Sequence, residues 1–154
     1  PESVEPFTYP ADGDAREAWY YEGLTLSIAG DGTLVDVSWT DPALIGPRGL
    51  KVGDSAQTVL SAFYRDSASG NDDILYAEGY VPELNAYLPP CGIITRLSRD
   101  NYIIEYLAPV EPYGEDVVAN PACYVYQSHA SVMFFCDRND TVTSIGWAEG
   151  PLAE

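Results

Sequence analysis

Alternation of apolar and polar residues is the clearest signal in the chain, and it first appears within residues 18–40. Leu24, Leu26 and Ile28 alternate with hydroxyl-bearing side chains, and the alternation resumes over 35–39 after a glycine-containing turn. A repeat of two residues is typical of a strand with one buried face and one solvated face. With the aromatic residues that precede the first run, this pattern predicts a three-stranded β-meander over about 18–40.

The same pattern returns near the end of the chain. An alignment without a gap places Leu24–Trp39 on Val132–Trp147, and apolar positions and the turn then coincide. Tyr124-Val125-Tyr126 precedes the second copy, as an aromatic run precedes the first. This predicts a second three-stranded meander over about 123–147. Internal duplication is the simplest explanation, and chance similarity between two amphipathic hairpins is the alternative.

One segment between the two meanders has helical spacing. Val59, Leu60 and Phe63 form a narrow apolar stripe, and Asp54 ahead of them fits the first position of a capping box. These features predict one helix over about 55–65. Because its apolar stripe is narrow, we expect this helix to lie on a sheet.

These elements place the chain in the α+β class. We expect a mostly antiparallel sheet from two similar three-stranded meanders (about 18–40 and 123–147), with the one clear helix (about 55–65) packed on it. A further hairpin is predicted over 92–107, whereas three prolines make 80–91 irregular, because proline cannot donate to a sheet ladder.

The chain of 154 residues has the length of one domain. Residues 1–15 contain several prolines and acidic side chains, which predicts a flexible N-terminal tether, and 16–150 should form the single α+β domain. The opening residues lack a methionine, a basic region and an apolar region, so we expect a mature chain whose targeting segment has been removed. No apolar run approaches the roughly 18 residues of a membrane span, so no transmembrane segment is expected.

Charge excludes some classes of partner. The chain carries 7 Lys+Arg against 24 Asp+Glu, a formal net charge of -17. Such a chain repels phosphate backbones and anionic membrane surfaces, so we expect no nucleic-acid partner. The carboxylates are evenly spread, which favours a solvated surface, with a cationic partner or calcium as the alternative. No acidic turn has the spacing of a calcium-binding loop, so no metal is expected. No other cofactor is expected either.

The segment Thr40–Phe63 resembles a known family. Gly49-Leu50-Lys51-Val52-Gly53-Asp54-Ser55 and the apolar helix after it follow the hairpin residues 31–37, an arrangement similar to a segment of lipoproteins from gut Gram-positive bacteria. The arrangement also resembles the small repeats of beta-lactamase-inhibitor-protein-like and outer-membrane-assembly small-lipoprotein domains. The resemblance implies helices paired with an antiparallel sheet and a lipid anchor upstream. Its motifs are caps and turns, so it implies no functional residue.

Candidate chemistry is sparse. His129 is the only histidine and is expected in a hairpin turn, without the partners of a catalytic triad, so no catalytic residue is assigned. Cys91, Cys123 and Cys136 lack the spacing of metal ligands. If His129-Ala130 is a two-residue turn, Cys123 lies opposite Cys136, within disulfide range. Two buried thiols are the alternative, and Cys91 stays free in either case.

The same hairpin predicts a partner-binding face. Tyr124 and Tyr126 would share a side with Met133 and Phe135, whereas the positions of the first meander that match these last two carry hydroxyl groups. Aromatic and methionine side chains that cluster on an exposed sheet face mark binding sites. The alternative is that another element covers them as a second core layer.

We therefore expect an extracytoplasmic, non-enzymatic domain, lipid-anchored at the cell surface or secreted, that binds another protein or peptide through this face. A module that binds cell-surface glycans through tyrosine and tryptophan rings is one alternative. A hydrolase whose site the sequence does not reveal is the other.

Overall fold

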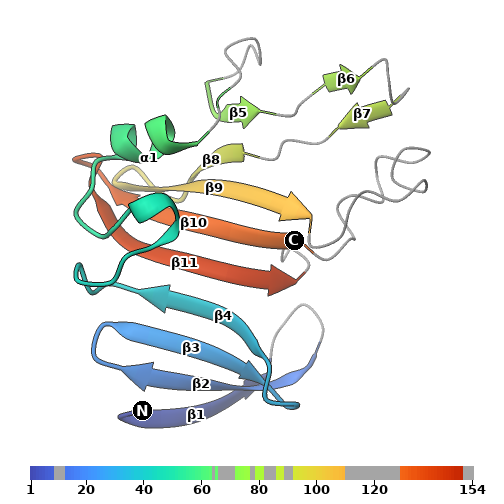
Figure 1. The fold of residues 1–154 in the computed structure, drawn as a ribbon, viewed down its shortest axis with the longest axis vertical. Helices are drawn as coiled ribbons and strands as arrows, with labels where there is room; N and C mark the ends of the chain where they lie inside the picture. The colour runs from blue at the N-terminus through green and yellow to red at the C-terminus, as the bar shows by residue number, and fades with distance from the viewer. Residues whose placement is uncertain are drawn as a thin grey trace.

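The computed structural model describes residues 1–8, 13–63, 65, 72–76, 79–81, 86–88, 92–109 and 129–150. Nine strands form one sheet in the order β1-β2-β3-β4-β11-β10-β9-β8-β5, and all neighbouring strands are antiparallel (Figure 1). The strands of this sheet are β1 (Ser3–Thr8), β2 (Ala15–Tyr21), β3 (Leu24–Ala29), β4 (Leu34–Trp39), β5 (Ile74–Tyr76), β8 (Gly92–Arg96), β9 (Asn101–Pro109), β10 (His129–Asp137) and β11 (Val142–Gly150). A separate pair consists of β6 (Gly79–Val81) and β7 (Ala86–Leu88). The fold is α+β with a mostly antiparallel sheet, as the sequence predicts.

The described residues contain one α-helix, α1 (Ala56–Ala62), and one short 3-10 helix, η1 (Pro47–Gly49). Helix α1 is capped by Ser55, whose Oγ accepts a hydrogen bond from the Thr58 N–H at 3.1 Å. The cap therefore lies one residue after the expected Asp54, whose carboxylate instead accepts from the Lys51 N–H at 2.9 Å. No helix in the described part of the chain is long and apolar enough to cross a membrane.

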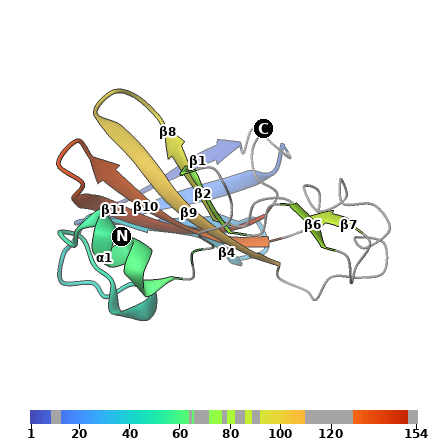
Figure 2. The same cartoon turned by 90° about the horizontal axis from the view of Figure 1, so that it is seen from above.

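Helix α1 packs on one face of the C-terminal half of the sheet, and Figure 2 shows it on one side only. Val59 is fully buried against Phe134 and the other core residues of β9–β11. Phe63, directly after the helix, stacks on the Tyr106 ring with centroids 4.0 Å apart. The apolar stripe predicted from the sequence is thus the face that contacts the sheet.

Two hairpins of the sheet share one construction. When Leu24–Trp39 is aligned with Val132–Trp147, the β3–β4 and β10–β11 hairpins have the same register, and each shifts register once, between Ser27 and Ile28 or between Phe135 and Cys136. The equivalent cross-strand pairs include Leu24↔Trp39 and Val132↔Trp147, Leu26↔Val37 and Phe134↔Ile145, and Ile28↔Leu34 and Cys136↔Val142. The similarity seen in the sequence therefore extends to the pairing of the strands.

The two hairpins meet in the middle of the sheet, where β4 pairs with β11. Ser38 lies opposite Gly146, which is its counterpart in the other hairpin, and Val37 lies opposite Trp147. The pairing is therefore symmetric about Ser38 and Gly146. Equivalent antiparallel strands paired in this way are related by a local twofold axis perpendicular to the sheet.

The two neighbours of β10 are β11 and β9, and the position of β9 corrects one expectation. β10 pairs with β11 along one edge and with β9 along the other, starting at His129 on both edges. His129-Ala130 therefore lies within a strand and is not the predicted two-residue turn. The prediction was wrong because the long-range partner β9 takes the edge that a local hairpin would have used. The strand expected at 123–128 lies outside the described residues.

The N-terminal residues also differ from the expectation of a flexible tether over 1–15. Ser3–Thr8 form β1, which pairs with β2 at the edge of the sheet. Val4 lies opposite Trp19, so the apolar side chain is placed beside an aromatic one. Cross-strand pairs of this kind stabilise a sheet by about 0.2–1 kcal/mol each, which favours the strand over a free segment.

Candidate functional site

Cross-strand pairing assigns each side chain to one face of the sheet, because directly opposite residues share a face. Phe63 contacts the rings of Tyr106 and Phe134, so these two residues mark the helix side. From them the pairs continue across the sheet in two rows, Phe134, Ile145, Trp39, Leu24 and Tyr21 in one, and Tyr106, Val132, Trp147, Val37, Leu26, Trp19 and Val4 in the other. Apolar side chains therefore extend without interruption from the helix-covered part of the sheet to β1.

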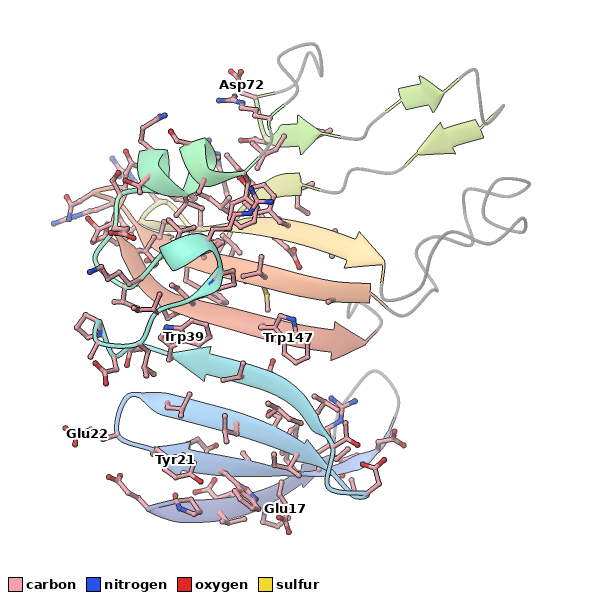
Figure 3. The ribbon with its side chains drawn as sticks, in the orientation of Figure 1. Glu17, Tyr21, Glu22, Trp39, Asp72 and Trp147 are labelled. Carbon is pink, nitrogen blue, oxygen red and sulfur yellow. The ribbon has the colours of Figure 1, made fainter. Side chains whose placement is uncertain are left out.

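We call the N-terminal part of this surface the open face. It consists of eight helix-side residues on β1–β4: Val4, Trp19, Tyr21, Leu24, Leu26, Ile28, Leu34 and Val37. In Figure 1, helix α1 lies over the C-terminal half of the sheet, and no described helix lies over β1–β3. Figure 3 labels Tyr21, Trp39 and Trp147, which mark the rows on β2, β4 and β11.

The open face is partly exposed to solvent, whereas its continuation beneath the helix is not. Tyr21, Leu34 and Val4 are 37%, 41% and 45% exposed. Phe134 and Ile145, farther along the same surface, have no exposed area. Removal of apolar area from water is favourable by about 25 cal/mol per Å², so the exposed side chains of the open face lack the stabilisation that their counterparts beneath α1 have.

Carboxylates dominate the surroundings of the open face. Residues 1–42 contain nine Asp and Glu residues but only one cation, Arg16. Glu17 lies on the helix side of β2, and Glu22 lies in the turn at the end of the strand. Arg16 alternates with Glu17, so its side chain lies on the other face of the sheet. The helix side of β1–β4 therefore carries an acidic side chain and no basic one.

The charge of Arg16 acts on a carboxylate of that other face. Burial raises the pKa of Asp36, and the attraction of Arg16 acts in the opposite sense. Asp36 lies opposite Ser27, one step along β3 from Leu26, and therefore on the face away from the helix. The one basic side chain of β1–β4 thus acts on a carboxylate of the face away from the helix.

One end of the open face is hollowed beside Trp19. The hollow has a volume of about 560 Å³, and its lining also includes Pro6, Ala15, Arg16, Glu17, Ile28, Ala29, Gly30 and Gly32. The indole Nε1 of Trp19 donates a hydrogen bond to Glu17 Oε2 at 2.9 Å. This bond orients the aromatic ring and leaves the second carboxylate oxygen of Glu17 as an acceptor.

The face expected from the sequence lies on the other side of the sheet. Met133 and Phe135 are half-buried on the side of β10 away from the helix. A Cβ at Gly146 would lie 3.5 Å from Met133 Cε and 3.7 Å from a ring carbon of Phe135, so both side chains lean over this glycine. Tyr124 and Tyr126 lie outside the described residues. The structure thus places two of the four expected residues together, away from the open face.

Cys136 is a free thiol in the core and is 1% exposed. Its cross-strand neighbours are Tyr102 and Val142, so the register that would place it opposite Cys123 does not occur. The geometric argument for a disulfide between Cys123 and Cys136 therefore fails, and Cys123 and Cys91 themselves lie outside the described residues. Burial raises the pKa of the Cys136 thiol to about 11, which keeps it protonated near neutral pH.

The acidic turn after β10 uses its carboxylates to build the turn. Asp137 Oδ1 accepts hydrogen bonds from the N–H groups of Asn139 and Thr141 at 2.8 and 3.0 Å. Asp140 Oδ1 accepts a hydrogen bond from the Tyr102 hydroxyl at 2.6 Å. The described residues contain no group of three or more His, Cys, Asp or Glu side chains arranged to hold a metal ion.

Sequence reasoning detected the alternation of the open face but assigned it to the core. The missed signal is a mismatch in size between the sheet and its cover. A helix of seven residues is about 10 Å long, whereas nine strands with a spacing of about 4.8 Å span about 38 Å. One short helix therefore leaves much of one sheet face without a helix above it.

Comparison of the chain with protein-family models, with curated proteins and with solved structures gave no match. The resemblance to lipoprotein and inhibitor-like repeats therefore stays a prediction from sequence motifs.

Proposed function

We propose that this protein is a non-enzymatic binding domain that holds another protein on its open face. The observation that carries the proposal is a pair of apolar rows that leave the helix-covered core and continue toward the sheet edge, where Tyr21 on β2 and Val4 on β1 are exposed. Burial of such side chains is the main source of affinity at protein interfaces, and Trp and Tyr are enriched at interface hot spots. The open face contains one of each, in Trp19 and Tyr21.

Charge favours a basic partner. The carboxylates of Glu17 and Glu22 lie beside the open face, and the only cation of residues 1–42 lies on the other side of the sheet. A partner with lysine or arginine around an apolar centre is attracted and associates faster. An acidic protein or an anionic membrane surface is repelled.

We also propose that the sheet arose by internal duplication, with β2–β4 as one unit and β9–β11 as the other. The common register of the two hairpins, their equivalent register shifts and the symmetric pairing of β4 with β11 support this proposal. In this arrangement, β9 takes the place that was predicted for 123–128. The open face and the helix-covered face are then two versions of one surface.

The location that we propose is outside the cytoplasm, as a lipid-anchored or secreted protein. Its support is the resemblance of residues 31–63 to lipoprotein segments. Labelling cells with a radioactive fatty acid and isolating the protein tests the anchor. Label on the protein supports anchoring, label-free protein in the medium supports secretion, and label-free protein in the cytosol contradicts both.

A second candidate function is glycan binding, which the hollow beside Trp19 favours. An oriented aromatic ring beside a carboxylate offers a flat apolar surface and a hydrogen-bond acceptor, the combination that small polar ligands need. Titration of oligosaccharides followed by NMR would shift the Trp19 indole signal, and Trp19→Ala would abolish binding while Trp147→Ala would not. A glycan panel that leaves the Trp19 signal unchanged contradicts this candidate.

Site-specific photo-crosslinking tests the main proposal. Tyr21 and Tyr20 are neighbours on β2 with nearly equal exposure, 37% and 36%, but they lie on opposite faces of the sheet. Benzoylphenylalanine at Tyr21 should give a discrete protein adduct in extracts of the native cell, whereas the same probe at Tyr20 should not. Excess wild-type chain should compete for the adduct, and a Trp19→Ser chain should not. Equal adducts at both positions, or none at Tyr21, contradict protein binding at the open face.

A further inference from the structure

The surface beneath helix α1 has a counterpart on the open face. The alignment of Leu24–Trp39 with Val132–Trp147 carries β3 and β4 onto β10 and β11, and β9 then occupies the place of β2 in the sheet. The corresponding helix-side residues are Trp19 and Ile104, Tyr21 and Tyr106, Leu26 and Phe134, Ile28 and Cys136, Leu34 and Val142, and Val37 and Ile145. The two surfaces therefore match in position, and both are built from aromatic and other apolar side chains.

Among the described residues, only the C-terminal version of this surface has a helix on it. Val59 of α1 is fully buried there, and the Phe63 ring lies 4.0 Å from Tyr106 and 5.8 Å from Phe134. Tyr106 is 4% exposed, whereas Tyr21 at the corresponding position is 37% exposed. The residue type is the same at the two positions, so the cover above them accounts for the difference.

We propose that the open face is the docking site for an amphipathic helix of a partner protein, seated as α1 is seated on the C-terminal half of the sheet. The inference rests on the proposed function and names the element that the partner contributes. The contact is made by apolar side chains at a helical spacing, Val59 and Leu60 in α1 and Phe63 directly after it. A partner helix needs the same kind of stripe, repeating at i, i+3, i+4 and i+7.

The size and charge of the open face define this helix further. Strands β1–β4 span about 14 Å at a spacing of about 4.8 Å, which a helix of about ten residues matches. The acidic surroundings, with Glu17 and Glu22 nearest, favour lysine or arginine on both sides of the apolar stripe. The occupant is therefore a basic amphipathic helix of about three turns or more.

A second copy of the chain is a poorer occupant. Helix α1 of each copy already packs on its own sheet, and two chains of net charge -17 repel each other. A cationic helix meets neither obstacle. Charge complementarity therefore favours a different, basic protein.

Three synthetic peptides, each long enough for about four helical turns, test the inference on the intact chain. The first has leucine and phenylalanine at i, i+3, i+4 and i+7 and lysine or glutamine elsewhere. The second is an isomer of the same composition with its apolar residues at every second position, and the third replaces lysine by glutamate in the first. Isothermal titration should show the first peptide binding at least about tenfold more tightly than either control. Helical circular dichroism should increase when it binds.

Paired variants locate the binding site. Tyr21→Ser should weaken binding of the first peptide by about tenfold or more, whereas Tyr20→Ser on the other face should change it by less than about twofold. Leu34→Ser, at an exposed position of the open face, should act like Tyr21→Ser. Leu97→Ser, at an exposed position outside this face, is its control. Circular dichroism of each variant verifies that the fold is retained.

Each remaining outcome overturns the inference in a distinguishable way. If the isomer binds as tightly as the first peptide and Tyr21→Ser weakens both, the open face binds protein but not a helix, so the proposed function stands alone. If no peptide binds while crosslinking at Tyr21 succeeds, the docking element is again not a basic helix. If both experiments fail, the inference and the proposed function fall together. A dimer in sedimentation velocity that Tyr21→Ser dissociates and Tyr20→Ser does not would assign the face to a second copy.

Discussion

Trp39 and Trp147 occupy equivalent positions in the two hairpins but have different surroundings. Trp39 is 9% exposed, and the segment after β4 approaches its indole ring at Gly46. Gly46 is the point of closest approach, where a Cβ would lie 2.9 Å from a ring carbon of Trp39 and 3.1 Å from the Leu50 carbonyl oxygen. Trp147 remains half-buried. The absent side chain of one glycine thus allows one of the two tryptophans to be covered.

Gly46→Ala should therefore destabilise the fold. The added methyl group overlaps an aromatic ring and a backbone oxygen, and overpacking of this kind costs about 1–3 kcal/mol of unfolding free energy. Urea unfolding followed by tryptophan fluorescence measures the loss. Gly30→Ala is the matched control, since the nearest atom to its Cβ would lie 3.7 Å away. A Gly46→Ala chain as stable as the Gly30→Ala chain would contradict the close contact.

Asp137 gives a pH-dependent contribution to stability. The N–H groups of Thr141 and Asn139 hold its pKa below the usual value of 3.8. A carboxylate whose pKa is lowered by folding stabilises the fold above its unfolded pKa, and this contribution is lost as the pH falls through the folded pKa. Asp137→Asn should therefore be less stable than wild type near pH 7, and the difference should shrink below about pH 4. A difference that persists unchanged at about pH 2 in urea unfolding would contradict this assignment.

The Cys136 thiol should resist alkylation in the native chain. With a pKa of about 11, only about one thiol in a thousand is ionised at about pH 8, and burial also blocks the reagent. Iodoacetamide labelling followed by mass spectrometry of the peptide that contains Cys136 measures the rate. Labelling should become fast in urea. An equal rate with and without urea would contradict a buried thiol.

At the scale of elements, local signals predicted local structure well. The alternation at Leu24–Ile28 and the helical stripe around Val59 depend only on neighbouring residues, and both elements form. The strand from His129 depends on β9, which lies much earlier in the chain, so a period-two pattern alone led to the wrong turn. Asp54 and Ser55 are both favourable caps, and choosing between them required the backbone geometry.

The cap of α1 offers a test at this scale. Ser55→Ala removes the side-chain acceptor for the Thr58 N–H, which also donates to the Ser55 carbonyl oxygen at 2.9 Å, and should lower the unfolding free energy by about 0.5–2 kcal/mol. Ser61→Ala, in the same helix, removes a hydroxyl that does not cap the helix. This hydroxyl donates a hydrogen bond to the Gln57 carbonyl oxygen and accepts one from the Gln57 side-chain amide. Because alanine is the better helix former, Ser61→Ala should be neutral or slightly stabilising. Urea unfolding followed by circular dichroism compares the two, and equal losses would contradict the cap assignment.

At the scale of the molecule, one sheet carries two similar apolar surfaces and, in the described part of the chain, one helical cover. Sequence patterns identify the apolar residues of both surfaces, including Trp19, Tyr21 and Leu26. They do not say where a helix of seven residues will lie, because that depends on tertiary packing across β9–β11. The binding face predicted from the sequence includes Met133 and Phe135, which lie on the opposite side of the sheet from the proposed open face, and it stays a prediction. The open face became visible only when the position of α1 was known.

The net charge of -17 predicts opposite effects of salt on folding and on binding. The ion pairs given by Arg96 with Asp73 and Arg65 with Asp72 lie at the surface, so their screening costs little stability. Screening of the repulsion among the excess carboxylates should instead raise the unfolding free energy between about 10 and 300 mM NaCl, by on the order of 1 kcal/mol. The same screening should weaken binding of the basic helical peptide.

Urea titrations measure the effect of salt on folding, and calorimetry at each salt concentration measures its effect on binding. A chain with both Glu17→Gln and Glu22→Gln is the control, and its binding should depend less on salt. Binding that strengthens with salt would mean that apolar contact alone, without charge complementarity, selects the partner.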